Sequence, residues 1–330
     1  MIGNSAALAF ALERVSQVAA INRPIIIFGD RGTGKELIAE RLHYLSPRWN
    51  EPFLKVNCAA LSEQLLESEL FGHESGAFTG ATSTRAGRFE RADGGTLFLD
   101  EVATMSTGLQ EKLLRLVEYG EYERLGGQTT LKVDVRIVAA THANLKEMAQ
   151  ANEFREDLLD RLSFDVIHVP ALSQRSEDIE ELAQHFAVQM CGELGWELFP
   201  GFTTSALETL RAHLWPGNVR ELKNVVERSV YRWADSRSAV DAVIIDAFES
   251  PFVSRERAQP IEAAAAPPKD DKSSHSFTEQ VEALEKQLLQ SALAKNANHQ
   301  KRTAQDLGLS YDQLRGMIRK YNLSNRIRRS

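Results

Sequence analysis

The sequence predicts an α/β protein in which helices flank a parallel sheet, followed by a smaller helical region and a C-terminal helix-turn-helix. Short apolar runs alternate with amphipathic ones over the first half of the chain, as in a parallel sheet covered on both faces. After Pro170 this strand pattern stops and only helical periodicity remains. Near the end, a small residue and a turn glycine separate two amphipathic stretches, which indicates a helix-turn-helix.

The strand candidates are short apolar runs bounded by polar or turn residues. They lie at 24–28, 53–56, 96–99, 135–140 and 164–169. Helices are predicted between them at 34–45 and 110–119. Three further helices are predicted after Pro170, at 177–192, 203–214 and 218–233, with a break at Trp215-Pro216-Gly217.

These patterns divide the chain into four expected parts. Residues 1–170 form an α/β subdomain, and residues 171–253 form a helical subdomain that follows it. Residues 254–276 are rich in Ala, Pro, Lys, Asp and Ser, a composition typical of a linker. Residues 277–330 form the helix-turn-helix part.

Composition excludes several classes of protein. The chain has 330 residues and a net charge of −7, which argues against a generally basic nucleic-acid coat. Eight Lys and Arg against two acids in residues 299–330 nevertheless predict an anionic partner for the C-terminal end. No apolar run approaches the roughly 20 residues of a membrane helix, and the start does not resemble a secretory signal. The two distant cysteines, Cys58 and Cys191, suggest a reducing compartment, so a cytoplasmic location is expected.

A glycine-rich loop between the first strand and its helix predicts a phosphate site. Its pattern is G-x-x-x-x-G-K in the required strand–loop–helix context. Backbone N–H groups of such a loop cradle phosphate oxygens, and the helix N-terminus adds positive potential there. Lys35 is expected to reach the β- and γ-phosphates of ATP. The candidate nucleotide contacts are Gly29, Asp30, Arg31, Gly32, Thr33, Gly34, Lys35 and Glu36.

An acidic pair follows the third strand candidate, in the arrangement called Walker B. Asp100 is expected to hold Mg²⁺, and Glu101 to orient and polarise the attacking water. A solvated strand end would also be acidic, but the upstream phosphate loop favours the catalytic interpretation.

The hexapeptide at 76–81 gives the chain a specific resemblance. Its residues are Gly76, Ala77, Phe78, Thr79, Gly80 and Ala81. This run is similar to the GAFTGA motif of bacterial enhancer-binding proteins, which are AAA+ ATPases that activate the sigma-54 form of RNA polymerase. The resemblance implies that the hexapeptide contacts the sigma factor when ATP is turned over. Two glycines and two alanines indicate a flexible loop with Phe78 and Thr79 exposed at its tip.

The resemblance extends to the rest of the chain. It implies an AAA+ nucleotide-binding subdomain, a helical lid subdomain and a Fis-type helix-turn-helix. Glu36 in place of the usual Ser or Thr is common in the family, and the runs 42–46 and 87–92 resemble activators of phage-shock operons.

The family resemblance also implies roles for individual polar residues. Asn57 matches the residue that grips the catalytic glutamate, and Arg220 matches the sensor II arginine of the lid. Arg155 and Arg161 match arginine fingers that reach the γ-phosphate of a neighbouring subunit in a hexamer. They are about 240° apart if both lie on one helix, so they are expected to do different jobs.

Thr141 and His142 occupy the sensor I position, where the family mostly has Thr-Asn. A histidine changes charge between about pH 5 and 8, so nucleotide sensing is expected to depend on pH. His142→Asn is expected to retain ATP turnover and to flatten this dependence.

The basic end matches a DNA-binding module. Ser310 is the expected N-cap of its second helix, which buries Leu314, Ile318 and Tyr321. The apolar series Phe277, Val281, Leu284, Leu288 and Ala292 predicts the preceding long helix. The expected DNA contacts are Tyr311, Gln313, Arg315, Arg319 and Lys320.

Two other interpretations remain open at this point. One is a DNA-binding regulator whose nucleotide is only structural, and the other is an AAA+ unfoldase or clamp-loader relative. The favoured interpretation has as partners sigma-54 RNA polymerase, upstream enhancer DNA, further copies in a hexameric ring and a separate inhibitor protein.

Overall fold

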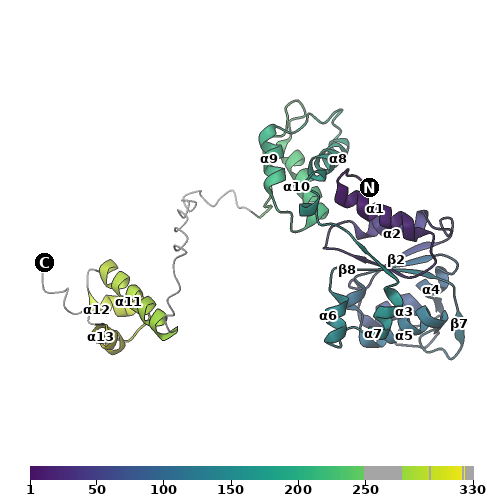
Figure 1. Ribbon diagram of the computed structural model, residues 1–330, viewed down its shortest axis with the longest axis horizontal. Helices are drawn as coiled ribbons and strands as arrows, with labels where there is room; N and C mark the ends of the chain where they lie inside the picture. Colours follow the sequence, from purple (N-terminus) through teal and green to yellow (C-terminus); the bar gives the residue numbers. More distant parts are fainter. Residues whose placement is uncertain (249–276, 297–298, 322, 324–330) are drawn as a thin grey trace. The chain divides into compact units, whose positions relative to one another are not determined.

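The computed structural model describes residues 1–248, 277–296, 299–321 and 323 (Figure 1). Two compact units form, an N-terminal unit, Met1–Glu249, and a C-terminal unit, Ser250–Ser330. The expected linker at 254–276 lies outside the described residues.

The predicted five-stranded parallel sheet is confirmed. Its order is β2-β5-β8-β1-β9, and every neighbouring pair is parallel. The strands are β1 (Ile25–Phe28), β2 (Phe53–Asn57), β5 (Thr96–Asp100), β8 (Arg136–Thr141) and β9 (Asp165–His168). The register pairs Asn57 with Asp100 and Phe28 with Thr141, so the carboxyl ends of four strands meet at one edge.

Helices cover both faces of this sheet, with α1 and α2 on one face and α3, α5 and α7 on the other (Figure 1). Ile25 and Ile27 pack in the core on the α1/α2 side, and Ile26 packs in the core on the opposite side. The helices of this part are α1 (Ala6–Ala19), α2 (Lys35–Tyr44), α3 (Glu63–Phe71), α4 (Arg88–Arg91), α5 (Thr107–Tyr119), α6 (Leu145–Gln150) and α7 (Glu156–Leu162). Two small antiparallel pairs that the sequence did not predict are β3 (Gly72–His73) with β4 (Arg85–Ala86), and β6 (Glu121–Glu123) with β7 (Thr130–Lys132).

The helical part of the N-terminal unit contains α8 (Asp178–Glu193), α9 (Thr204–Ala212) and α10 (Asn218–Trp233). Buried Trp215 lies in its core and donates its indole N–H to the carbonyl of Leu210 at 2.8 Å. Trp215 and Asn218 both have positive φ, 52° and 53°, so the chain turns sharply into α10. Single-turn 3₁₀ helices lie at Val102–Thr104 and Leu172–Gln174.

The C-terminal unit consists of α11 (Phe277–Lys295), α12 (Gln300–Asp306) and α13 (Tyr311–Lys320). Ser310 caps α13 as predicted, and Leu314 and Ile318 are buried, whereas Tyr321 is only half-buried. The predicted face of α11 is wrong by one position at Leu288, which is 54% exposed, because its neighbour Leu289 fills the core instead. The side chains of Phe277, Val281 and Leu284 lie outside the described residues.

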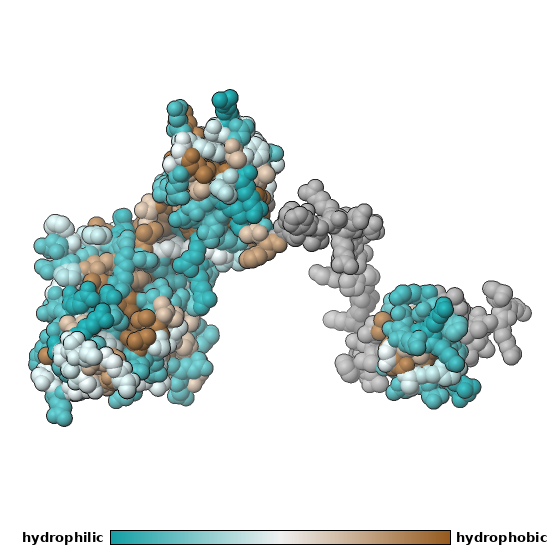
Figure 2. Space-filling view, turned by 180° about the vertical axis from the view of Figure 1, so that it is seen from behind, coloured by the Kyte–Doolittle hydropathy of each residue, from teal (hydrophilic) through white to brown (hydrophobic). Residues whose placement is uncertain are grey.

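Hydrophilic residues cover much of the surface of both units on the side seen in Figure 2. Within the described ranges, no helix is both long and apolar enough to span a bilayer.

Asp178 joins the start of α1 to the start of α8. Its carboxylate accepts hydrogen bonds from the backbone N–H groups of Asn4 and Ser5, at 2.7 and 2.8 Å. It also accepts one from the Ser5 hydroxyl at 2.7 Å. Asp178 and Ser5 are both almost completely buried, so removal of this carboxylate leaves the buried donors of Ser5 without a partner.

Asp178→Ala is expected to lower the free energy of unfolding of the N-terminal unit by about 3–5 kcal/mol, because it leaves buried donors unpaired. Such a loss corresponds to a fall in melting temperature of roughly 6–20 °C for a unit of this size. Thermal unfolding of the full chain measures it, with Asp178→Asn, which keeps one acceptor oxygen, as the milder control. An unchanged melting temperature in Asp178→Ala would show that the contact contributes nothing.

Acidification is expected to destabilise the N-terminal unit through His43. This ring is buried, stacks on Phe53 and lies 3.0 Å from the Thr96 hydroxyl. Burial, with a smaller effect of Arg136, lowers the pKa of His43 below its ordinary value of 6.5. The unfolded chain therefore binds the proton first, so this stability is present above about pH 6.5 and is lost as the pH falls. His43→Gln should show a smaller drop in melting temperature than the wild type between about pH 7.5 and 5.5. Equal drops would contradict the assignment.

Candidate active site

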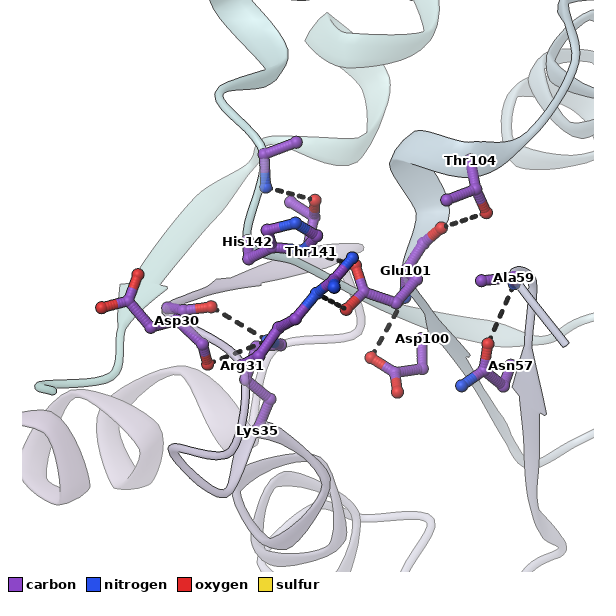
Figure 3. A network of polar contacts seen from close by, with 12 residues as sticks. Asp30, Arg31, Lys35, Asn57, Ala59, Asp100, Glu101, Thr104, Thr141 and His142 are labelled. Atoms are coloured by element: carbon purple, nitrogen blue, oxygen red, sulfur yellow. Dashed lines mark hydrogen bonds and ion pairs between the residues drawn. The ribbon is translucent and has the colours of Figure 1, made fainter. Parts of the chain in front are cut away.

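The glycine-rich loop connects β1 to α2 at the carboxyl edge of the sheet (Figure 3). Gly34 caps α2 with a φ of 100°, a left-handed conformation that favours glycine. Lys35 begins the helix, and its ammonium donates to the carbonyls of Gly29 and Asp30 at 2.9 and 3.2 Å. Burial lowers the pKa of Lys35, and the carboxylates of Glu101 and Asp100 oppose this effect. The loop thus holds a buried cation beside two acids.

Residues of the helical part hold this loop in place. The Asn218 side-chain amide donates to the carbonyl of Arg31, and the Val219 backbone N–H donates to that of Gly32, both at 3.0 Å. The buried Arg175 guanidinium donates to the carbonyl of Thr33 at 2.9 Å. A side chain at Gly32 would place its Cβ 2.2 Å from the Gly217 carbonyl oxygen, so this position requires glycine.

The sequence did not identify Asn218 or Arg175 as site residues. Asn218 lies two residues before Arg220, in the run that predicted the sensor II arginine, so its neighbourhood was a usable signal. Arg220 is exposed on α10, and its Cβ lies 3.1 Å from a Cβ placed on Gly32. Its charge contributes to the lowered pKa of Lys35.

The acidic pair lies across from this loop at the end of β5. Burial and the charge of Glu101 raise the pKa of Asp100 above its ordinary range. Asp100 also accepts a hydrogen bond from the Glu101 backbone N–H at 3.0 Å. Among the described residues no group of three or more His, Cys, Asp or Glu side chains is arranged to hold a metal ion. A single carboxylate fits Mg²⁺, which binds one or two carboxylates together with phosphates and water.

Glu101 is held by His142 and is only 13% exposed (Figure 3). The Nδ1 atom of His142 lies 2.8 Å from its Oε2, and the Nε atom of Arg31 lies 3.9 Å from its Oε1. Thr141 is buried, and its hydroxyl oxygen accepts from the Ala143 N–H at 2.9 Å.

The expected contact between Asn57 and Glu101 is not formed. Asn57 ends β2 at the predicted edge, but its side-chain oxygen accepts from the Ala59 N–H at 2.9 Å, closing a local turn. His142 makes the side-chain hydrogen bond to Glu101 that was expected from Asn57.

The two candidate finger arginines lie at opposite ends of α7, Arg155 half-buried and Arg161 exposed. Arg155 is the N-cap residue, with a ψ of 128°, and pairs with Asp157. Arg161 lies in the last turn and pairs with Glu118 at 2.7 Å. The estimate of 240° around one helix is therefore wrong, because Arg155 precedes the helix. Among the described residues, neither guanidinium is bonded to the glycine-rich loop of its own chain.

The hexapeptide forms a compact loop between β3 and β4. Gly76 donates to the Ala81 carbonyl at 2.8 Å, and Ala81 donates to that of Phe78 at 3.0 Å. Gly76 and Gly80 have φ values of 84° and 107°, with open space where a Cβ would lie. Thr79 is exposed as expected. Phe78 is half-buried rather than exposed, because its ring packs edge-on against the ring of His73, with the two ring centroids 5.0 Å apart.

An ion-pair network that the sequence did not predict holds the base of this loop. Arg124, just after β6, pairs at 2.8 Å with both Glu74 and Glu90. Glu74 also accepts from the Thr84 hydroxyl at 2.7 Å, across the base of the loop.

The five expected DNA contacts all lie on the exposed surface of α13. Three of them also bond within the unit, and the Tyr311 hydroxyl donates to the Gln300 side-chain oxygen at 3.4 Å. The Gln313 side chain accepts from the Ser310 N–H at 2.9 Å, completing a capping box, and Lys320 pairs with Glu282 at 3.1 Å. Arg315 and Arg319 are the exposed cations between them.

Family models cover most of the chain. The Sigma-54 interaction domain matches residues 1–168, the AAA+ ATPase lid domain matches residues 173–248, and the Fis family of bacterial regulatory proteins matches residues 280–321.

Individual relatives agree with these matches. The chain is 52% identical over 325 residues to the Psp operon transcriptional activator of Escherichia coli (strain K12), covering 98% of both chains. It is 48% identical over 243 residues to the Nif-specific regulatory protein of Azotobacter vinelandii, covering 74% of this chain and 46% of that one. The crystal structure of NtrX from Brucella abortus in complex with ATP has a TM-score of 0.69 and 33% identity, covering 98% of this chain and 69% of that chain.

Proposed function

The chain belongs to the bacterial enhancer-binding proteins, the sigma-54-dependent transcriptional activators of the phage-shock activator type, and we propose that it couples ATP hydrolysis to promoter opening at a phage-shock (envelope stress) operon. The observation that carries the proposal is the convergence of Lys35, Asp100 and Glu101 at one edge of the sheet, beside a glycine-rich loop.

Each group at this edge has a task in the proposed reaction. Backbone N–H groups of the 29–36 loop bind the phosphates of ATP, and Lys35 neutralises their charge. Asp100 holds Mg²⁺, which supplies further charge neutralisation on the phosphates when bound. Glu101 orients and polarises the attacking water. Thr141, His142 and Arg220 surround the site from the sheet and the lid.

The site is completed by a neighbouring protomer in a hexameric ring. Arg161 is exposed and Arg155 is half-buried, and their present partners Glu118 and Asp157 are exposed carboxylates. Such surface pairs are weak, so they can be exchanged for the phosphates bound by the next subunit. Arginine fingers of this kind contribute strongly to phosphoryl transfer.

The moving part is the hexapeptide 76–81. Thr79 is exposed and Phe78 is only partly packed, so the loop can leave His73 without opening the core. Nucleotide turnover moves it against sigma-54 in the closed promoter complex.

The C-terminal unit binds upstream enhancer DNA through Tyr311, Gln313, Arg315, Arg319 and Lys320. Tethering the ring upstream raises its effective concentration at the promoter. The protein acts in the cytoplasm, and a separate inhibitor protein that docks on the ATPase surface restrains it.

Transcription in vitro tests the proposal. Full chain, sigma-54 RNA polymerase and a template with upstream sites should give transcripts with ATP but none with a non-hydrolysable analogue. Transcripts with the analogue would favour a regulator whose nucleotide is only structural. ATP turnover without binding to sigma-54 would favour an unfoldase relative.

A further inference from the structure

The hydrogen bond between His142 and Glu101 is the principal side-chain restraint on the proposed catalytic carboxylate. An ionised carboxylate only accepts hydrogen bonds, so the Nδ1 atom of His142 carries the proton in this 2.8 Å contact. Arg31 is farther away, at 3.9 Å, and its side chain is 70% exposed. Its guanidinium is therefore a weaker restraint than the histidine.

The backbone of Glu101 makes such a restraint useful. Its φ of 53° is an unusual, left-handed value for a residue with a side chain. The Thr104 hydroxyl donates to the Glu101 carbonyl at 2.8 Å and helps to hold this conformation. The backbone conformation thus sets the direction of the Cα–Cβ bond of Glu101, and His142 sets the position of its carboxylate.

Asn57 is engaged elsewhere. Its side-chain oxygen accepts a hydrogen bond from the Ala59 N–H and closes a local turn. Asn57 is exposed at the end of β2. Within the part of the chain that the structure describes, no hydrogen bond runs from the Asn57 side-chain amide to Glu101, whereas the Nδ1 atom of His142 lies within hydrogen-bonding distance of the Glu101 carboxylate.

We propose that His142 is the positioning residue that holds the Glu101 carboxylate for water activation in this chain. This rests on the proposed function. It assigns to the residue after Thr141 a task that the family resemblance gave to Asn57.

The chemistry of the side chains defines a sharp substitution. The Nδ2 atom of an asparagine is attached to Cγ, as is the Nδ1 atom of a histidine. His142→Asn therefore keeps an N–H donor at nearly the same place, whereas His142→Ala removes it.

The expected results concern kcat and KM separately. Loss of positioning in His142→Ala should lower the kcat of ATP hydrolysis by about ten- to a hundredfold, with the KM for ATP within about twofold of the wild type. His142→Asn should retain at least about half of the wild-type kcat, and Asn57→Ala should change kcat less than about threefold.

Melting temperature and binding of a fluorescent ATP analogue check that each variant is folded. A normal kcat in His142→Ala, or equal losses in His142→Asn and His142→Ala, would overturn the positioning role. A larger loss in Asn57→Ala than in His142→Ala would return that role to Asn57. Absence of turnover in the wild type would instead remove the proposed function.

Discussion

Thr79→Ala is expected to reduce ATP-dependent transcription at least about a hundredfold, a loss of roughly 2.7 kcal/mol, while ATP turnover stays within about twofold of the wild type. Thr79 is exposed at the tip of the hexapeptide, and no hydrogen bond of its side chain occurs within the described structure. Its removal therefore costs the fold little, and the loss measures contact with the sigma factor. A few central residues commonly carry such an interface.

Thr82→Ala is the matched control. Thr82 is also exposed, but it lies beyond the six residues proposed to touch sigma-54. Transcription in vitro and ATP turnover are measured on the same preparations, with Thr82→Ala near the wild type in both. Equal activation by Thr79→Ala and the wild type would remove the hexapeptide from the mechanism.

Glu101→Gln is expected to lower the kcat of ATP hydrolysis by about 10²- to 10⁴-fold, because the amide cannot polarise water as a carboxylate does. The variant should still bind ATP. Gln has nearly the same shape as Glu, and its side-chain oxygen can still accept the hydrogen bond from the Nδ1–H group of His142. Binding of a fluorescent nucleotide and steady-state turnover separate the two effects.

A surface glutamate supplies the control for this substitution. Glu147 is exposed on α6 and accepts a hydrogen bond from Asn144 at 2.8 Å, which a glutamine oxygen also accepts. Glu147→Gln should leave turnover unchanged. If Glu101→Gln retained full turnover, another group would have to activate the water.

The parts of this protein that depend on backbone pattern were predictable from its sequence. Strands buried on both faces, such as Ile25–Phe28, read as continuous apolar runs. The glycine-rich loop is recognisable because Gly32 and Gly34 meet local conformational needs that few other residues satisfy.

The parts that depend on a choice between competing partners were not predictable. The Asn57 side chain has both an acceptor and a donor, so its residue type alone does not say whether it contacts its own turn or Glu101. Adjacent Leu288 and Leu289 are equally apolar, so only packing decides which is buried. The helix α7 begins at Glu156, so Arg155 does not share one helix with Arg161. Helix ends are the least certain feature of a sequence pattern.

The hydrogen bonds between the helical lid subdomain and the glycine-rich loop have a consequence for nucleotide exchange. Because Asn218 and Val219 hold consecutive carbonyls of that loop, the lid cannot swing as a free rigid body without reshaping the cradle below it. Binding of ATP and release of ADP would then displace the first turn of α10, which contains Asn218 and Val219. A change at the nucleotide site would therefore be transmitted to the helical lid subdomain through these hydrogen bonds. This coupling is separate from the one that moves the hexapeptide.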